Sequence, residues 1–163
     1  MDKSAVIRRL TQVRTVENVR AVPPGAAKSA PASVPDFVQR ELENASSEAK
    51  ADLRSLQEAG WTFGAQQEAP PDAAFELVVD ADGHLKLAGR ALTVKISPDL
   101  DRQAVETLLS RMRLKLRRKL GFAPNTFLLE TEEGSALKAA KALNDLSEVL
   151  YAEPSLVEPI QSR

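Results

Sequence analysis

The chain has 163 residues, no cysteine and a formal net charge of −1 at pH 7. This length is enough for one ordinary domain, or for a small domain with extensions, and the absence of cysteine excludes disulfides, thiolate metal ligands and a cysteine nucleophile. The near-zero charge provides no general attraction to nucleic acid or to an anionic membrane, and no segment approaches the ~20 apolar residues of a membrane span.

The first 35 residues predict a weak helix followed by a linker. Within residues 2–20, the apolar side chains Val6, Leu10, Val13 and Val16 recur at spacings of three and four, which is typical of an amphipathic helix. Prolines then recur between residues 21 and 35, which favours an extended, flexible linker. The N-terminus shows no apolar core of signal-peptide length, so we expect a cytoplasmic location.

Residues 36–87 predict a helical extension and a β-hairpin. The helix should begin at Asp36 and end at Gly60, with Trp61 and Phe63 just beyond it as anchors onto a core. The hairpin should cover residues 75–87, because an apolar run and an alternating run flank an Asp-Ala-Asp-Gly turn.

Residues 88–163 predict a domain with the order β-α-β-β-α-β. Strands are expected at 92–96, 114–120, 126–131 and 149–152. A helix with an apolar stripe should follow the first strand, and an alanine-rich helix should follow the third. This order is the ferredoxin-like arrangement, in which both helices cover one face of an antiparallel sheet. The fold class is therefore α+β, with predicted domains at 1–35, 36–87 and 88–163.

The end of the chain resembles a known family. Val149-Leu150-Tyr151-Ala152-Glu153-Pro154 follows the alanine-rich segment Ser135–Asn144, and Leu92–Ile96 forms the opening strand. This combination resembles the propeptides of subtilisin-type serine proteases and the propeptide-like inhibitors related to them. The resemblance covers residues 90–163 and leaves residues 1–87 uncovered.

The resemblance implies that the chain binds and inhibits a subtilisin-like serine protease, or assists its folding. The open sheet face would dock on the protease, and the C-terminal tail would lie in the active-site cleft. Both a free-standing bacterial inhibitor and the pro-segment of a longer precursor fit this function. The implied contact residues are Leu116, Phe127, Leu129, Tyr151, Glu153, Pro154, Ile160, Gln161, Ser162 and Arg163.

The tail has two interpretations. If Arg163 fills the primary pocket of the protease, Ile160 falls at the fourth subsite, where subtilisin-like enzymes usually accept an apolar group. The tail would then add a strand to the cleft. The plainer interpretation of residues 158–163 is a frayed terminus.

A nucleic-acid- or small-ligand-binding module of the same fold is the alternative function. The basic cluster Lys115, Arg117, Arg118 and Lys119 suggests it, but the expected sheet lacks the aromatic pair on which RNA bases stack. Neither nucleic acid nor a membrane is therefore expected as a partner.

His84 is the only histidine and is expected to be a turn residue. No nucleophile motif or phosphate loop occurs, so no enzymatic activity, metal or cofactor is expected.

Overall fold

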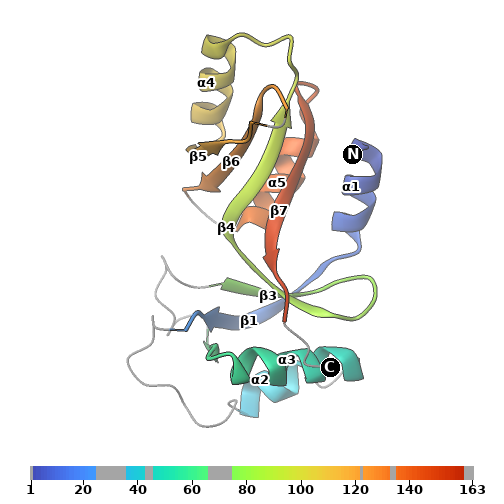
Figure 1. Cartoon of the computed structure of the whole chain (residues 1–163). Coiled ribbons are helices and arrows are strands. Elements are labelled where there is room, and N and C mark those ends of the chain that lie inside the picture. Colours follow the sequence, from blue (N-terminus) through green and yellow to red (C-terminus); the bar gives the residue numbers. More distant parts are fainter. Residues whose placement is uncertain are drawn as a thin grey trace. The chain divides into compact units, whose positions relative to one another are not determined.

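The computed structural model describes residues 2–24, 36–42, 46–65, 75–121, 123–132 and 135–159. They form a mixed α+β structure with an open antiparallel sheet (Figure 1). None of the described helices has the length and apolar character needed to cross a membrane. The elements are α1 (Lys3–Thr11), β1 (Arg14–Val22), α2 (Asp36–Glu41), α3 (Ser47–Glu58), β2 (Thr62–Ala65), β3 (Phe75–Val79), β4 (Leu85–Ile96), α4 (Arg102–Arg111), β5 (Leu114–Lys119), β6 (Thr126–Thr131), α5 (Ala136–Asn144) and β7 (Val149–Val157).

The chain divides into two compact units, and each is discontinuous in sequence. Unit 1 comprises residues 1–11 and 90–155, and unit 2 comprises residues 12–89 and 156–163. Helix α1 therefore belongs with the C-terminal elements, while β1 belongs to unit 2. The two units divide the chain after residues 11, 89 and 155. The domain boundaries predicted at residues 35 and 87 stay a prediction.

In unit 1, β6 pairs with both β4 and β5, and β7 pairs with β4. The register places Leu92 opposite Leu129 and Val94 opposite Phe127, and all four side chains are buried. Helices α4 and α5 contribute further buried residues to this unit. Side chains that alternate with the buried set, including Thr93 on β4, remain partly exposed. One face of these strands therefore forms a core and the other stays accessible.

In unit 2, β1 lies between β2 and β3, and β3 pairs with the first residues of β4. Helices α2 and α3 pack together beside these strands (Figure 1). Their side chains Val38, Leu42 and Leu56 join Val19 and Leu77 in one buried cluster. This unit therefore has a hydrophobic core of its own.

The helix predicted over residues 2–20 is wrong beyond Thr11. Residues 14–22 form strand β1, whose core-facing side chains are Val16, Val19 and Ala21. Asn18 has a positive φ of 65°, and the pairing register with β3 shifts between Val16 and Arg20. This bulge inserts extra residues after Val16, so the core-facing Val16 and Val19 stand three positions apart and do not show the alternation of a regular strand. Residues 25–35 of the predicted linker lie outside the described residues.

The single helix predicted from Asp36 to Gly60 is also wrong, because the structure has the two helices α2 and α3 there. Ser46 caps the second one, accepting a hydrogen bond from the Ala49 backbone N–H at 3.1 Å. The hairpin over residues 75–87 is confirmed, although its return strand continues through β4 to Ile96.

The two aromatic anchors predicted after α3 are confirmed. Phe63 is buried, and the ring of Trp61 packs edge-on against Phe75 with centroids 5.1 Å apart. Both Trp61 and Phe75 lie against the core of unit 2. This aromatic pair fixes the start of β2 after the helix has ended.

Candidate protein interaction surface

Strand β7 carries the sequence on which the family resemblance rests, and its first half is held by other parts of unit 1. The side chain of Asn144 donates to the backbone oxygen of Ala152 at 2.9 Å and accepts from its N–H at 2.8 Å. The Lys3 ammonium donates to the backbone oxygens of Leu146 and Val149, both at 2.8 Å. The contacts to Val149 and Ala152 satisfy backbone groups of β7 that an edge strand would otherwise offer to a further strand.

Glu153 and Pro154 are likewise engaged within unit 1. The Arg9 guanidinium from α1 forms an ion pair with the Glu153 carboxylate. Pro154 is buried, and Tyr151 is half-buried. Sequence reasoning missed the role of α1, because nothing in residues 3–11 indicates that they meet a strand placed over 140 positions later.

The three apolar residues expected on the open sheet face have different environments. Leu116 is 45% exposed, whereas Phe127 and Leu129 are buried in the core of unit 1. Phe127 and Leu129 are therefore corrected from surface residues to core residues. Their strand β6 instead presents Leu128 and Glu130, both partly exposed, on its other face.

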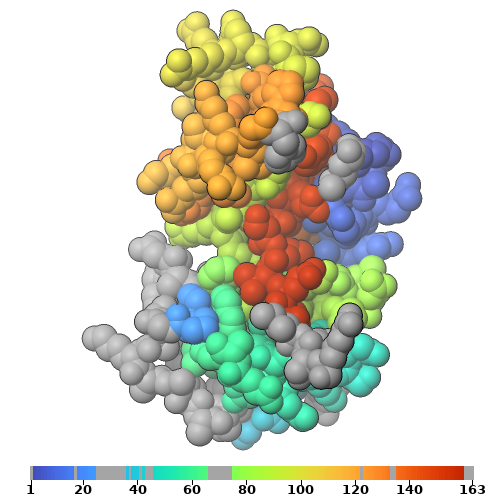
Figure 2. All heavy atoms as spheres, in the orientation of Figure 1, coloured from blue at the N-terminus to red at the C-terminus, as the bar shows by residue number. Residues whose placement is uncertain are grey.

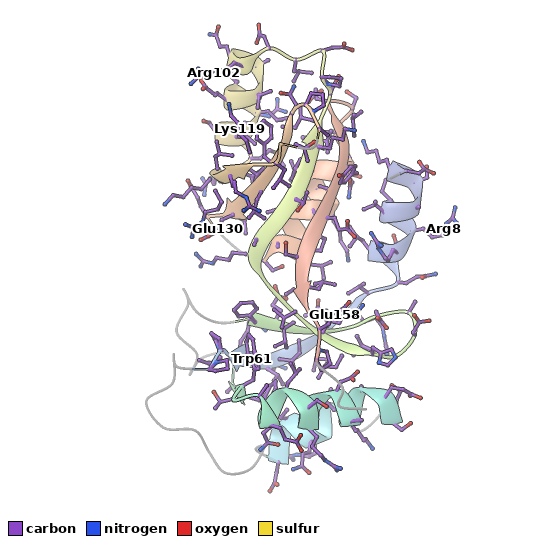
Figure 3. The ribbon with its side chains drawn as sticks, viewed as in Figure 1. Arg8, Trp61, Arg102, Lys119, Glu130 and Glu158 are labelled. Atoms are coloured by element: carbon purple, nitrogen blue, oxygen red, sulfur yellow. The ribbon has the colours of Figure 1, made fainter. Side chains whose placement is uncertain are left out.

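The accessible part of β5 is strongly basic. Lys115, Arg117, Arg118 and Lys119 are all exposed, and the Arg117 guanidinium pairs with Glu130 on β6. Side chains of β5 and β6 lie on the near surface in orange in Figure 2, and Figure 3 labels Lys119 and Glu130 on these strands. The surface thus combines Leu116 with several cations.

The segment after β7 is anchored within unit 2. The Lys86 ammonium lies 3.0 Å from an Asp80 carboxylate oxygen and 3.1 Å from one of Glu158, which Figure 3 labels. Desolvation opposes the charge of Lys86, but hydrogen bonds to Asp80 and Glu158 outweigh it, and the pKa of Lys86 is raised. The predicted tail contacts Ile160, Gln161, Ser162 and Arg163 lie outside the described residues.

His84 connects the hairpin of unit 2 to α3, a role that the turn prediction did not include. Its Nδ1 lies 3.0 Å from a carboxylate oxygen of the fully buried Asp52, which also accepts from the Leu85 N–H at 3.0 Å. The hydrogen bond to Asp52 outweighs desolvation and raises the pKa of His84. Among the described residues, no three acidic or histidine side chains gather into a group that could hold a metal ion.

Comparison with family models, with curated proteins and with solved structures found no match to this chain.

Proposed function

We propose that this chain binds and inhibits a subtilisin-like serine protease, or assists its folding, and that it acts as a binding protein and not as an enzyme. The observation that carries the proposal is the pairing of the strands in unit 1. Strand β6 lies between β4 and β5, β7 joins β4, and α4 and α5 connect them in the order β-α-β-β-α-β. This arrangement supports a ferredoxin-like domain, the fold that the resemblance implies. The expected cytoplasmic location belongs to the same proposal.

The distribution of exposed apolar side chains supports unit 1 as the docking unit. Within the part of the chain that the structure describes, the exposed large apolar side chains are Ile7, Leu116 and Leu150. All three belong to unit 1. Covering an exposed apolar side chain with a partner is favourable, so unit 1 is the unit expected to contribute apolar contacts to an interface.

The proposed mechanism has two parts. The accessible sheet face, on which Leu128 and Glu130 of β6 lie, docks on the protease together with the sheet edge at Leu116, and the basic side chains of β5 favour a docking surface with carboxylates. The segment beyond Glu158 then lies in the active-site cleft as an added strand, held by backbone hydrogen bonds.

Inhibition assays test this proposal. Purified subtilisin and a trypsin-type serine protease are incubated with the full chain, and hydrolysis of a chromogenic peptide is followed. The expected result is tight inhibition of subtilisin together with weak or no inhibition of the second enzyme. Failure to bind or inhibit subtilisin and other proteases of its fold would overturn the proposal.

Nucleic-acid binding is the second candidate, and the basic strand β5 is the observation that favours it. Lys115, Arg118 and Lys119 are exposed and make no ion pair among the described residues. Binding of this kind should weaken steeply as salt concentration rises. Titration of a labelled single-stranded oligonucleotide at two salt concentrations separates it from protease docking.

A further inference from the structure

Helices α2 and α3 of unit 2 enclose a groove that takes no part in the proposed contact with a protease. Its volume is about 610 Å³, which falls within the range of roughly 300–1,000 Å³ that is typical of ligand sites. Helix α2 and the residue after it contribute Asp36, Gln39, Arg40 and Leu42, and α3 contributes Lys50, Leu53, Arg54 and Gln57.

The groove has an apolar floor and a polar rim because of the spacing on its helices. Lys50, Leu53, Arg54 and Gln57 occupy positions i, i+3, i+4 and i+7 of α3, which lie on one helix face. Leu53 is buried at the floor together with Leu42. The charged ends on the same helix face stand at the rim in contact with solvent.

Among the described residues, the rim carries an excess of positive charge without ion-pair partners. Arg40, Lys50 and Arg54 are exposed, and none of them makes an ion pair with another described residue. Asp36 supplies the one carboxylate among the described lining side chains. Lys86 of the same unit, by contrast, is paired with carboxylates of Asp80 and Glu158.

We infer that this groove binds an acidic peptide segment in which carboxylates flank an apolar side chain. The apolar side chain covers Leu42 and Leu53, and the carboxylates meet Arg40, Lys50 and Arg54. A small inorganic anion would use the cations but leave the apolar floor uncovered. The described lining side chains include no aromatic ring on which a nucleic-acid base could stack. The charge and the floor together therefore fit a peptide better than either alternative.

A fluorescence anisotropy titration of the full chain tests the inference. The probe is a short labelled peptide in which glutamates flank leucines, and its matched control carries glutamine in place of every glutamate. Saturable binding of the acidic peptide that weakens with added salt is the expected result, since the rim charges are exposed. Equal binding of the glutamine peptide would overturn the inference.

Variants locate the binding. The triple variant Arg40→Glu, Lys50→Glu, Arg54→Glu should weaken binding about tenfold or more, because it replaces three attractions by three repulsions. The single variant Arg54→Gln should weaken binding by a smaller factor. Lys141→Glu, at an exposed position of α5 in unit 1, is the control for net charge and should bind as the parent does. The inference fails if Lys141→Glu weakens binding as much as Arg54→Gln does, or if an unlabelled oligonucleotide displaces the peptide more strongly than unlabelled peptide.

Discussion

The side-chain amide of Asn144, the last residue of α5, bonds to both backbone groups of Ala152 in the middle of β7. Both residues are buried, so water cannot replace these bonds. The seven residues between them turn the chain from helix to strand, and the amide fixes that turn. The strand that carries Tyr151 and Glu153 is thereby positioned by a helix of the same unit.

Replacing Asn144 by leucine should lower the free energy of unfolding by about 1–3 kcal/mol, because the buried N–H and oxygen of Ala152 lose their partner. Urea denaturation followed by circular dichroism measures this change. The neighbouring Asp145 is exposed, so Asp145→Ala should change the stability by less than about 0.5 kcal/mol. Equal stability of the Asn144→Leu protein and its parent would show that the amide bonds contribute nothing.

The stability of unit 2 should decrease as the pH rises above 6.5. The hydrogen bond to Asp52 raises the pKa of His84 above its usual value of 6.5 in the folded chain. The protonated form is therefore favoured by folding, and its stabilisation is complete below pH 6.5 and is lost as the pH rises through the folded pKa. Asp52, Asp80 and Glu48 all act on His84 in this direction.

Two measurements check this pH dependence. The chain has one histidine, so its imidazole signals in a proton NMR titration report the pKa of His84 directly. The pKa should lie above 6.5 in the parent and move toward 6.5 in Asp52→Asn. In urea unfolding, His84→Gln should remove this part of the pH dependence. A parent pKa at or below 6.5 would contradict the prediction.

Leu116 and Leu129 lie opposite each other on β5 and β6, but substitutions there should have different effects. Leu129 is fully buried, so Leu129→Ala should cost about 2–5 kcal/mol of stability. Leu116 is exposed, so Leu116→Asp should leave the stability nearly unchanged and raise the inhibition constant for subtilisin about tenfold or more. Unfolding curves and inhibition assays on the same samples separate the two effects. Unchanged inhibition by Leu116→Asp would remove the sheet edge at β5 from the docking surface.

Ile160→Ala should raise the inhibition constant for subtilisin about tenfold or more, because burial of one such side chain in an apolar subsite is worth roughly 1.5–3 kcal/mol. Lys141→Ala, at an exposed position of α5 outside the predicted contact residues, is the control and should inhibit as the parent does. Direct binding measured alongside should show that the sheet still docks. If both variants inhibit as the parent does, the tail has no role in the cleft.

The elements of unit 1 could be predicted because their patterns are local. Alternation along residues 92–96 and 126–131 predicted β4 and β6, and the structure confirms both strands. Strand β1 could not be found in this way, since the bulge at Asn18 removes its alternation. The short strand β2, over residues 62–65, was also missed.

The contacts that position the candidate site could not be predicted for a different reason. Asp52 and His84 are separated by 32 positions, and Arg9 and Glu153 by 144. Each pair forms only because the fold brings distant residues together, and a single sequence carries no signal for it. Leu116 and Leu129 lie on the same sheet face, and their different exposure depends on the strand order, which places β5 at the edge of the sheet and β6 inside it.

The discontinuity of the two units determines when each can be completed during synthesis. Lys3 can form its hydrogen bond to Val149 only after the ribosome has added 146 further residues. Translation at about 5–20 residues per second makes this delay roughly 7–30 s. The core of unit 2 is likewise incomplete until Val157, which packs against it, has been synthesised. The newly made helix α1 therefore leaves the ribosome with its apolar side uncovered, and the nascent chain is exposed to chaperones and proteases until the last strand arrives.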